Sequence, residues 1–458
     1  MIELRNKKVA IIGLSRTGLA TAKFLDKLAK KVIVSDVKGK KQLEKEIEDL
    51  INTNVEFELN GHGEKCLAAD MIVTSPGVPL DLPFFIEARK RGIEIISEIE
   101  LAYHFTEAKI IAITGTNGKT TTTSLIGEIL SNADIAKVRV AGNIGKPLIE
   151  EIENLSKDDF LVVEISSFQL ETIKDFKPHI SLYLNFTPDH LDRHKNIENY
   201  WSAKKRIFEN QNSSDYAIVN ANDSEVMRAV QDFPGVIYKI KDSNDTGLDK
   251  GIYISSENII LKHKDKEIPI LKINEIPLMG FHNVQNVAFS AMASYLAGVS
   301  IDIIKETVIN FKASAHRMEV INDYDEFLII DDSKATNPAA AIKALESISK
   351  PIVLIAGGQD RDANFDELLE LINKKVKFLV LIGETANKLK EGALKLGFDN
   401  INIHIAKDMR EAVKIAYENL ESDNCLLLSP ACPSWDMYSS YKERGKRFQE
   451  ALNLLNLN

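Results

Sequence analysis

Features that define several protein classes are scarce in this chain of 458 residues. It has only three cysteines (Cys66, Cys425 and Cys432), and their spacing fits neither a disulfide framework nor a metal cluster, as in proteins of a reducing compartment. No apolar run approaches the roughly 20 residues that a membrane-spanning helix needs. The N-terminus turns glycine-rich soon after its first apolar residues and carries no cleavage signature. We therefore expect a cytoplasmic protein with no membrane partner.

Positive charge is also in short supply. The chain has 57 Lys and Arg residues against 67 Asp and Glu residues, which gives a formal net charge of −10. Nucleic-acid-binding domains carry a basic surface, so this balance argues against a nucleic-acid partner. An acidic protein that binds an acidic ligand must neutralise it locally, with a helix N-terminus, single Lys or Arg side chains, or Mg²⁺.

What the chain does have is a recurrent alternation of apolar strands and helical segments, which is typical of parallel α/β sheets. Its length is too great for one hydrophobic core. We predict three successive α/β domains, over residues 1–97, 98–313 and 314–458. The first and third are expected to be Rossmann-like, and the central one to resemble a P-loop ATPase.

The apolar runs predict where the strands lie. We expect them at 31–36, 71–77 and 93–98 in the first domain, at 160–165, 180–186 and 216–222 in the second, and at 327–332, 352–358, 377–383 and 425–430 in the third. Residues 236–273 change to short alternating strands with turn residues, which predicts an antiparallel excursion. A helix over 282–298 is expected to close the second domain.

The most informative segment is GTNGKTT at 115–121, between an apolar run at 109–113 and an amphipathic run at 124–130. A glycine-rich turn between a strand and a helix presents main-chain N–H groups and the positive end of the helix to phosphates. Lys119 would reach the outer phosphates, and the Thr120 hydroxyl would bind Mg²⁺. Ile113 stands where the strict P-loop pattern has glycine, so this is a shortened version. A chance turn is the weaker alternative, and we expect ATP or a close relative as ligand.

A second turn, within residues 9–25, contains Gly13 and Gly18 and is followed by Asp36 at the end of the next strand. This arrangement is similar to the dinucleotide fingerprint, but Ser15 occupies the place of its middle glycine. The substitution argues against an NAD site. From these residues alone, a purely structural turn and a nucleotide site are equally open.

Polar residues follow two further strands of the second domain. Glu164 ends one strand, and the segment NFTPDHLDRH at 185–194, which offers Asp189, His190 and His194, follows the next. A single acid at a strand end is often a helix cap or a salt-bridge partner. Because carboxyl ends of parallel strands share one edge of the sheet, two such ends near Lys119 and Thr120 favour a Mg²⁺ site.

The third domain offers three polar segments. DDSKATNPAA at 331–340 places Asp332 and Lys334 at a strand end, and its Thr-Asn-Pro part predicts a capped helix. Lys334 is a poor cap and a good anion ligand. HRMEV at 316–320 could form a phosphate clamp between domains. The aromatic residues in 429–445, which include Trp435, Tyr438 and Tyr441, predict either a ligand wall or plain surface.

Together these motifs resemble the Mur ligases, which build the peptide of peptidoglycan precursors. The likeness rests on GTNGKTT, VVEISSFQLE, NFTPDHLDRH, HNVQNVAFSAM, HRME, DDSKATNP and SPACPSWDMY, which follow one another in the family's order over nearly the whole chain. DSKATNP and SPACPSWDMY resemble the D-glutamate-adding branch in particular. The family has three domains, in agreement with the blocks above.

The resemblance implies roles for residues at matching positions. ATP would bind to Gly115, Thr116, Asn117, Gly118, Lys119, Thr120, Thr121, Asn283, Asn286, Arg317 and Asp332. Two Mg²⁺ ions would be held by Thr120, Glu164, His190 and Lys204, with Lys204 converted by CO₂ into a carbamate. The UDP-sugar would meet Leu14, Ser15, Arg16, Asp36, Ser75, Gly77 and Asn143. D-Glutamate would meet Lys334, Thr336, Arg361, Ser434, Trp435 and Tyr441, with Arg361 at a place where the family also uses lysine.

The reaction that the resemblance implies is ATP-driven amide formation. The carboxylate of UDP-N-acetylmuramoyl-L-alanine would attack the γ-phosphate to give an acyl phosphate, and the amine of D-glutamate would then displace phosphate. Lys119, His190, Lys204 and Lys334 would be the catalytic residues, in a monomer whose C-terminal domain closes onto the central one.

Three other readings stay open. One is another ligase of the superfamily, such as an L-alanine-adding enzyme or a folylpolyglutamate synthase. Another is an NAD-dependent oxidoreductase, which the first domain alone would suggest. The third is a nucleotide-sensing protein without catalysis. The amino acid on which ADP release depends would separate these classes.

Overall fold

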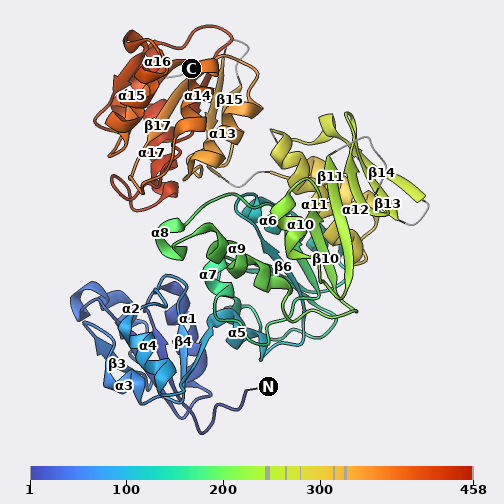
Figure 1. Cartoon of the computed structure of the whole chain (residues 1–458), viewed down its shortest axis with the longest axis vertical. Helices are drawn as coiled ribbons and strands as arrows, with labels where there is room; N and C mark the ends of the chain where they lie inside the picture. Colours follow the sequence, from blue (N-terminus) through green and yellow to red (C-terminus); the bar gives the residue numbers. More distant parts are fainter. Residues whose placement is uncertain are drawn as a thin grey trace. The chain divides into compact units, whose positions relative to one another are not determined.

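The computed structural model describes residues 2–242, 248–263, 266–278, 280–312, 315–323 and 327–455. Its contacts divide the chain into two compact units (Figure 1). Unit 1 comprises residues 1–275 and 286–309, and unit 2 comprises 276–285 and 310–458. The units hold three β-sheets, two in unit 1 and one in unit 2. The three-domain α/β fold expected from the sequence is confirmed; the exact domain boundaries stay a prediction.

The first sheet has five parallel strands in the order β3-β2-β1-β4-β5. Its strands are β1 (Lys8–Ile12), β2 (Lys31–Asp36), β3 (Glu56–Leu59), β4 (Met71–Thr74) and β5 (Glu94–Ser97). The helices are α1 (Arg16–Asp26), α2 (Glu44–Glu48), α3 (Glu64–Leu67), α4 (Pro83–Lys90) and α5 (Glu98–Tyr103). Val9 and Ile11 of β1 pack in one core with Leu25 of α1, while Ala10 and Ile12 pack in another with Phe85 of α4. The sheet is therefore covered on both faces, as a parallel sheet requires.

The central sheet has nine strands in the order β14-β13-β12-β11-β10-β9-β6-β8-β7. They are β6 (Lys109–Thr114), β7 (Val138–Gly142), β8 (Phe160–Glu164), β9 (Ile180–Tyr183), β10 (Tyr216–Asn220), β11 (Val236–Asp242), β12 (Lys250–Ile254), β13 (Asn258–His263) and β14 (Lys266–Lys272). The helices are α6 (Lys119–Ala133), α7 (Ser167–Leu170), α8 (Leu191–His194), α9 (Ile197–Lys205), α10 (Ser224–Ala229), α11 (Phe281–Leu296) and α12 (Ile301–Asn310).

Two expectations for this region need correction. The antiparallel excursion does not begin at 236, because β11 pairs parallel with β10 and β12 pairs parallel with β11; the antiparallel pairs are β12–β13 and β13–β14. Alternating hydrophobicity reports that one face of a strand is exposed and says nothing about strand direction, which explains the error. The helix predicted at 282–298 is present as α11, but α12 follows it.

The sheet of unit 2 has the order β15-β16-β20-β17-β18-β19, in which only the edge strand β15 is antiparallel. Its strands are β15 (Glu319–Asp323), β16 (Leu328–Asp331), β17 (Ile352–Gly357), β18 (Val376–Ile382), β19 (Ile403–Ile405) and β20 (Cys425–Leu428). The helices are α13 (Pro338–Ser347), α14 (Asp366–Lys375), α15 (Ala386–Lys395), α16 (Met409–Glu418) and α17 (Tyr441–Asn453). Strand β15 contains the last two residues of the HRMEV segment, for which the sequence predicted only a phosphate clamp.

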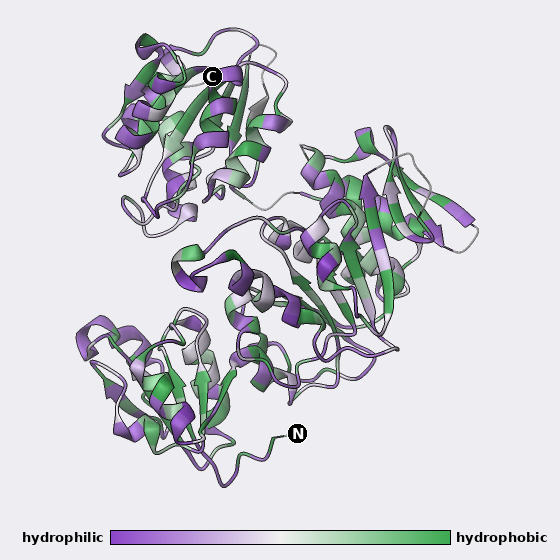
Figure 2. Cartoon of the chain, in the orientation of Figure 1, coloured by the Kyte–Doolittle hydropathy of each residue, from purple (hydrophilic) through white to green (hydrophobic). Residues whose placement is uncertain are grey.

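Hydrophobic residues concentrate on the central strands of the sheets, whereas the helices and loops carry most of the hydrophilic ones (Figure 2). All residues of β4, β8, β16, β17 and β20 are buried. Among the helices of the described residues, none is both long and apolar enough to cross a membrane.

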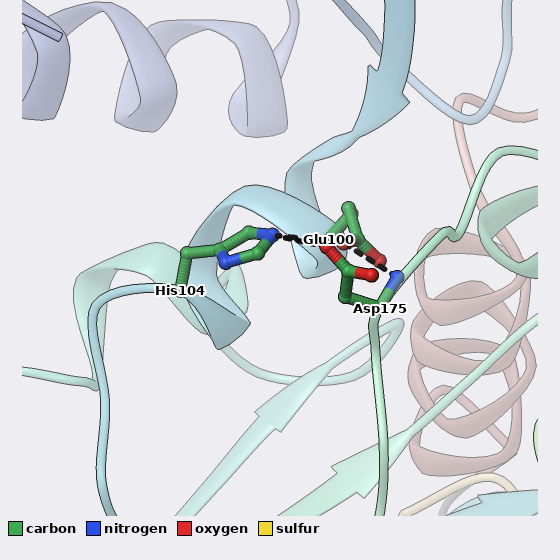
Figure 3. A group of neighbouring side chains, drawn as sticks. All are labelled: Glu100, His104 and Asp175. Carbon is green, nitrogen blue, oxygen red and sulfur yellow. Dashed lines mark hydrogen bonds and ion pairs between the residues drawn. The ribbon is translucent and has the colours of Figure 1, made fainter. Parts of the chain in front are cut away.

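Helix α5, which leads from the first sheet to the second, is held by the carboxylate of Glu100. Its oxygens accept hydrogen bonds from the main-chain N–H groups of Lys174, Asp175 and Phe176 at 2.8–2.9 Å. His104 Nε2 lies 3.0 Å from one Glu100 oxygen and 3.5 Å from an Asp175 oxygen (Figure 3). Glu, His and Asp are metal-ligand types, but main-chain donors already occupy both oxygens of this buried carboxylate. We therefore interpret the cluster as a structural connection between α5 and segment 172–176.

Candidate active site

The turn between β6 and α6 depends on two glycines with positive φ, Gly115 (152°) and Gly118 (83°). A side chain at Gly118 would overlap Oδ1 of Asn286 from α11, so glycine is needed for both conformation and close approach. Asn185, directly beyond β9, shapes the turn from the neighbouring strand. Its main-chain oxygen accepts from Thr116 N at 3.1 Å, and its side-chain oxygen accepts from Asn117 N at 2.8 Å.

Two lysine side chains converge on this turn. Lys119 Nζ donates to the carbonyl oxygens of Gly115 and Thr116, each at 2.8 Å. Lys204 Nζ, from α9, donates to the same Gly115 oxygen at 2.8 Å. The Lys119 ammonium lies on this carbonyl beside the first turn of α6, and this geometry favours a negatively charged ligand at the turn.

Lys204 is 2% exposed. Burial, together with the charge of Lys119, holds the pKa of the Lys204 amine well below its usual range, and the carboxylates of Asp189 and Glu164 oppose this shift. Its neutral form is therefore favoured far more than in an exposed lysine, and a neutral amine is a nucleophile.

Glu164 ends the fully buried strand β8, as predicted, and its side chain lies near that of Asn143. Its Oε1 accepts a hydrogen bond from Asn143 Nδ2 at 2.8 Å. Its Oε2 is buried, and no donor of the described residues reaches it. A buried carboxylate oxygen without a donor is costly unless a cation meets it, and Mg²⁺ prefers such hard oxygen ligands.

The segment that contains His190 lies beyond β9. His190 has a φ of 53°, and its main-chain N–H donates to Asp189 Oδ1 at 2.8 Å. The imidazole packs edge-on against the ring of Phe168, with 5.1 Å between centroids, and is 6.2 Å from the ring of Tyr200. Lys204 Nζ lies 4.8 Å from the same Tyr200 ring. His190 and Lys204 thus both lie beside the Tyr200 ring.

Sequence reasoning did not assign roles to Tyr200 or Asn185. The hydroxyl of Tyr200 lies 3.2 Å from Thr116 Oγ1, which in turn donates to the Thr187 carbonyl at 3.1 Å. Tyr200 is four residues before Lys204, so the two share one face of α9. That spacing could have predicted that Tyr200 lies beside Lys204. Nothing in the sequence paired Asn185 with the turn almost 70 residues earlier.

The other predicted ATP residues of unit 1 lie near the turn. Thr120 and Thr121 belong to the first turn of α6, Thr120 half-buried and Thr121 buried. Asn286 is buried in α11, and its Oδ1 lies 3.4 Å from Thr122 Oγ1. Asn283 is buried in the same helix but is grouped with unit 2.

The residues predicted to meet a UDP-sugar lie after β1, at the end of β2 and after β4, except that Asn143 follows β7. Strands β1 and β4 are neighbours although β2 follows β1 in the chain, and such a switch point opens a ligand crevice. Ser75 Oγ donates to the Gly13 carbonyl at 2.9 Å and joins the loops after β1 and β4. Asp36 accepts from Leu14 N at 2.7 Å and from Lys38 N at 2.9 Å.

Three further members of this set lie at the borders of the crevice. Ser15 is the N-cap of α1, and its side chain makes no capping hydrogen bond. Arg16 donates to the Gly145 carbonyl at 2.6 Å, which links α1 to the loop that carries Asn143. The Gly77 carbonyl accepts from the Arg193 guanidinium at 3.3 Å.

In unit 2, Asp332 follows β16 and is buried. Its oxygens accept from Ser429 Oγ at 2.9 Å and from Met318 N at 3.3 Å. Burial raises the pKa of this carboxyl from its usual value of 3.8 to about 7, although these hydrogen bonds and the charge of Arg317 lower it. A cationic ligand or partner would restore the charged form.

The residues predicted to receive an amino acid gather in the loops after β16, β17 and β20, which are adjacent strands. Lys334 Nζ lies 3.9 Å from the centroid of the Tyr441 ring, and the Arg361 guanidinium lies 4.6 Å from that of Trp435. Ser434 is buried, whereas Trp435 is 60% exposed. Thr336 is half-buried and does not cap α13: the cap is Asn337, whose side chain accepts from Ala340 N at 2.9 Å.

Arg444 was not predicted, yet it joins two of these loops. It is 1% exposed, and its guanidinium donates to the Ser333 carbonyl at 2.7 Å and to the Cys432 carbonyl at 2.9 Å. The sequence had shown Arg444 only as part of a charged helix. Its low exposure and its partners, over 100 residues away in one case, are visible only in the fold.

Family models match three stretches of the chain. They are the Mur ligase MurD-like N-terminal domain over residues 7–97, the Mur ligase middle domain over 113–294, and the Mur ligase glutamate ligase domain over 316–432.

Curated relatives are similar over their full length. The UDP-N-acetylmuramoylalanine–D-glutamate ligase of Clostridioides difficile is 44% identical over 99% of this chain and 100% of its own. The enzyme of the same name from Thermoanaerobacter sp. (strain X514) is 44% identical over 98% of this chain and 99% of its own.

Solved structures with related folds are more distant in sequence. A pseudomurein peptide ligase type C from Methanothermus fervidus has a TM-score of 0.60 at 20% identity, covering 98% of this chain and 100% of that chain. A UDP-N-acetylmuramate–alanine ligase from Thermotoga maritima has a TM-score of 0.60 at 16% identity, with the same coverage. At these identities the likeness concerns the fold.

Proposed function

The chain belongs to the Mur ligase family, and from this premise we propose that it is an ATP-dependent ligase that joins D-glutamate to UDP-N-acetylmuramoyl-L-alanine. The observation that carries the proposal is the convergence of Lys119 and Lys204 on the Gly115 carbonyl, beside a buried carboxylate with one oxygen left without a donor. This arrangement suits phosphoryl transfer. The name of the relatives supplies the two substrates.

The proposed reaction has two steps. An oxygen of the L-alanyl carboxylate attacks the γ-phosphorus of ATP, and ADP leaves, which gives an acyl phosphate. The D-glutamate amine then attacks the acyl carbon, an amide bond forms, and phosphate leaves with the former carboxylate oxygen. The product is a peptidoglycan precursor. In phosphoryl transfer a protein acts mainly through positioning and charge neutralisation, which is what the residues of this site offer.

For ATP, we assign the phosphates to the turn at 115–118 and the first residues of α6. Lys119 would exchange its two carbonyl partners for phosphate oxygens, because a charge-assisted hydrogen bond is stronger than one to a neutral acceptor. Asn283 and Asn286 are assigned to the adenine side, and Arg317 and Asp332 of unit 2 to the nucleotide.

For Mg²⁺, the donor set fits the ion. Glu164 offers its unpartnered Oε2, Thr120 offers a hydroxyl, and His190 offers a nitrogen, which is a less typical ligand for this metal. When bound, Mg²⁺ would neutralise charge that develops on the transferring phosphoryl group. Asn143, which donates to Glu164 Oε1, would keep the carboxylate oriented.

For Lys204, we propose reaction with CO₂. The neutral amine attacks the carbon of CO₂, an N–C bond forms, and one proton leaves, so that an ammonium site becomes a carbamate anion. The depressed pKa of Lys204 supports this step, because only the neutral amine has the free electron pair. A carbamate beside Glu164 would supply a second anionic ligand for the metal site.

For D-glutamate, the loops of unit 2 offer two cations to a ligand with two carboxylates. Lys334 and Arg361 lie on the faces of Tyr441 and Trp435, which limits their rotamers without removing their charge. Thr336 and Ser434 would add hydroxyl contacts. Arg361 presents a planar fork where the family also uses lysine, so its geometry toward a carboxylate differs.

For the UDP-sugar, we assign the crevice between β1 and β4. Leu14, Ser15, Arg16, Asp36, Ser75 and Gly77 would meet the nucleotide, and Asn143 the sugar. Asp36 accepts the Leu14 N–H, and Ser15 in place of the middle glycine of the dinucleotide fingerprint argues against NAD. We also propose that the protein acts in the cytoplasm as a monomer, which sedimentation of the full chain would test.

The proposal is tested by ADP release from ATP in the presence of UDP-N-acetylmuramoyl-L-alanine and one amino acid at a time. D-Glutamate should support turnover, and L-glutamate, L-alanine and L-lysine should not. Turnover with UDP-N-acetylmuramate and L-alanine, but not with D-glutamate, would replace this function with that of an alanine-adding ligase.

A further inference from the structure

Arg193, which no role above uses, connects the first domain to the metal side of the central one. It lies in α8, three residues after His190. Its guanidinium donates to the Gly77 carbonyl at 3.3 Å and to the Val78 carbonyl at 2.8 Å. Its Nη2 also lies 3.4 Å from Glu171 Oε2. One half-buried side chain thus holds two consecutive carbonyls of the first domain and a carboxylate of the central domain.

The two carbonyls belong to the loop that follows β4. This loop borders the crevice at the switch point of the first sheet, because β4 is the neighbour of β1 and Ser75 is hydrogen-bonded to Gly13. Ligands of open α/β sheets bind in such crevices. Any ligand that displaces or orders residues 75–78 therefore acts on the partners of Arg193.

On its other side, Arg193 shares two partners with the histidines of the same segment. Its guanidinium carbon lies 4.9 Å from the centroid of the Phe168 ring, and His190 packs on that ring at 5.1 Å. His194 stacks on Phe168 at 5.0 Å with the planes 12° apart, and its Nδ1 lies 3.4 Å from Glu171 Oε1. Phe168 and Glu171 are thus contacted from both Arg193 and its neighbours.

The same elements lead back to the end of β8. His194 Nε2 lies 2.9 Å from Ser167 Oγ, and Ser167 is three residues after Glu164. Ser167, His194 and Glu171 follow the atom order of a hydrolytic triad, but Ser167 and His194 are both buried, so we interpret them as support for α8. Arg193 is therefore packed on the Phe168 ring that His190 also contacts, in a helix that begins three residues after Glu164.

We propose that Arg193 is a positioning residue that couples ligand occupancy of the crevice beside residues 75–78 to the placement of His190 and Glu164. The inference deepens the proposed function and depends on it, because that function makes the UDP-sugar the ligand of the crevice. Guanidinium geometry is required: its several donors in one plane serve two carbonyls and a carboxylate together, which a lysine ammonium cannot reproduce from one stem.

The consequence is a thermodynamic coupling between two ligands. If UDP-N-acetylmuramoyl-L-alanine orders the loop at 75–78 and Arg193 transmits this order, then Mg²⁺ with a non-hydrolysable ATP analogue should tighten UDP-sugar binding. Coupling of this kind changes affinity by about fivefold or more, and it is reciprocal. A residue that serves only folding would weaken both ligands and leave the coupling factor unchanged.

The test is calorimetric titration of UDP-N-acetylmuramoyl-L-alanine into the full-length protein, with and without Mg²⁺ and the ATP analogue. We expect the ratio of the two Kd values to be about fivefold or more in the wild type and to fall below about twofold in Arg193→Lys. Arg193→Ala and Glu171→Gln should reduce the ratio as well. Lys195→Ala is the matched control, because the exposed Lys195–Asp81 ion pair (3.0 Å) spans the same two domains without touching residues 77 and 78.

A wild type without coupling, or an Arg193→Lys protein with the wild-type ratio, would overturn the proposal. Loss of coupling in Lys195→Ala as well would also overturn it, since any contact between the domains would then suffice. Failure of the wild type to bind the UDP-sugar at all would contradict the proposed function itself, and the coupling would fall with it.

Discussion

Two turns of this molecule share a backbone plan and differ in charge. The turn after β1 and the turn after β6 each join a buried parallel strand to a helix through a glycine with positive φ, Gly13 in the first and Gly118 in the second. In each turn, a main-chain N–H group donates a hydrogen bond to a side chain at or just beyond the end of a neighbouring strand. In the first turn that residue is Asp36, a carboxylate; in the second it is Asn185, a neutral amide.

The difference indicates what each turn can hold. The second turn holds the Lys119 ammonium at the start of α6, so negative charge of a polyphosphate is stabilised there. The first turn is bound by the Asp36 carboxylate, and Arg16, which follows this turn, is hydrogen-bonded to the Gly145 carbonyl. Similar strand-turn-helix geometry therefore serves, in our proposal, phosphoryl transfer from ATP in one domain and binding of a UDP-sugar in the other.

The largest expected effect comes from removal of the cation of the second turn. Lys119→Ala should lower kcat by about 10³-fold, as for the loss of one preorganised donor to a developing oxyanion. The Kd of the UDP-sugar should stay within about twofold, because the first turn is unaffected. Steady-state ADP release and calorimetry measure the two quantities. Lys109→Ala, at the opposite end of β6, is the control and should be active; an active Lys119→Ala would contradict the comparison.

Lys204→Ala should lose about 10²-fold in kcat and regain part of it with added acetate or formate, which replace the carbamate anion. Lys205→Ala is the matched control, because Lys205 is next in the chain but packs against the Trp201 ring. Carbon NMR with labelled bicarbonate should show a carbamate signal in the wild type and in Lys205→Ala. A carbamate signal that survives Lys204→Ala would contradict carbamylation of Lys204. Rescue of Lys205→Ala alone by the added carboxylates would do so too.

Substituting Asp36 and Asn185 separately tests whether the two turns act on different substrates. Asp36→Ala leaves the Leu14 and Lys38 N–H groups without their carboxylate, and Asn185→Ala leaves those of Thr116 and Asn117 without part of theirs. Each loss should destabilise the conformation of its turn by about 1–3 kcal/mol. We expect Asp36→Ala to raise KM mainly for the UDP-sugar and Asn185→Ala mainly for ATP, each about tenfold. Equal effects of both variants on both substrates would show that the turns do not act separately.

A third turn, after β16, holds a carboxylate as the first one does, but buries it. The pKa of Asp332 is raised to about 7 by burial, so the folded protein keeps the proton over a range where the unfolded chain has lost it. This contribution to stability is complete below the unfolded pKa and is lost as the pH rises through the folded value. Without ligands, the stability of the wild type relative to Asp332→Asn should fall by about 1 kcal/mol per unit between about pH 5 and about pH 6.5.

Urea unfolding of both proteins at several pH values measures this difference, which is the smallest of the effects predicted here. A difference that rises with pH would mean that Asp332 is ionised in the folded protein and paired with a cation. The third turn would then resemble the second more than the first.

Much of the fold follows from the sequence because buried parallel strands are continuous apolar runs. The runs at 31–36 and 160–165 appear as β2 and β8 almost residue for residue. Strands such as β3 and β15, which are edge strands, were missed because polar residues interrupt them. Strand direction at β11 and β12 was also not predictable, since it depends on the path of the connections.

The site could be predicted where its residues follow strands in short motifs. Lys119 and Lys204 both donate to the Gly115 carbonyl and Glu164 ends β8, while their roles in the reaction stay predictions. The residues that support them could not be predicted, because each is hydrogen-bonded to a partner far away in the chain. Asn185 bonds to Asn117, Arg444 to Ser333, and Arg193 to Gly77. Such pairs depend on the packing of strands and domains, which one sequence does not display.

The most direct test of the central claim follows one oxygen atom. UDP-N-acetylmuramoyl-L-alanine labelled with a heavy oxygen isotope in its alanyl carboxylate is incubated with ATP, Mg²⁺, D-glutamate and the wild-type protein, and the released phosphate is analysed by mass spectrometry. The account predicts one labelled oxygen in each phosphate and a product heavier by one D-glutamate residue. Phosphate without label, or label released equally well without D-glutamate, would contradict it.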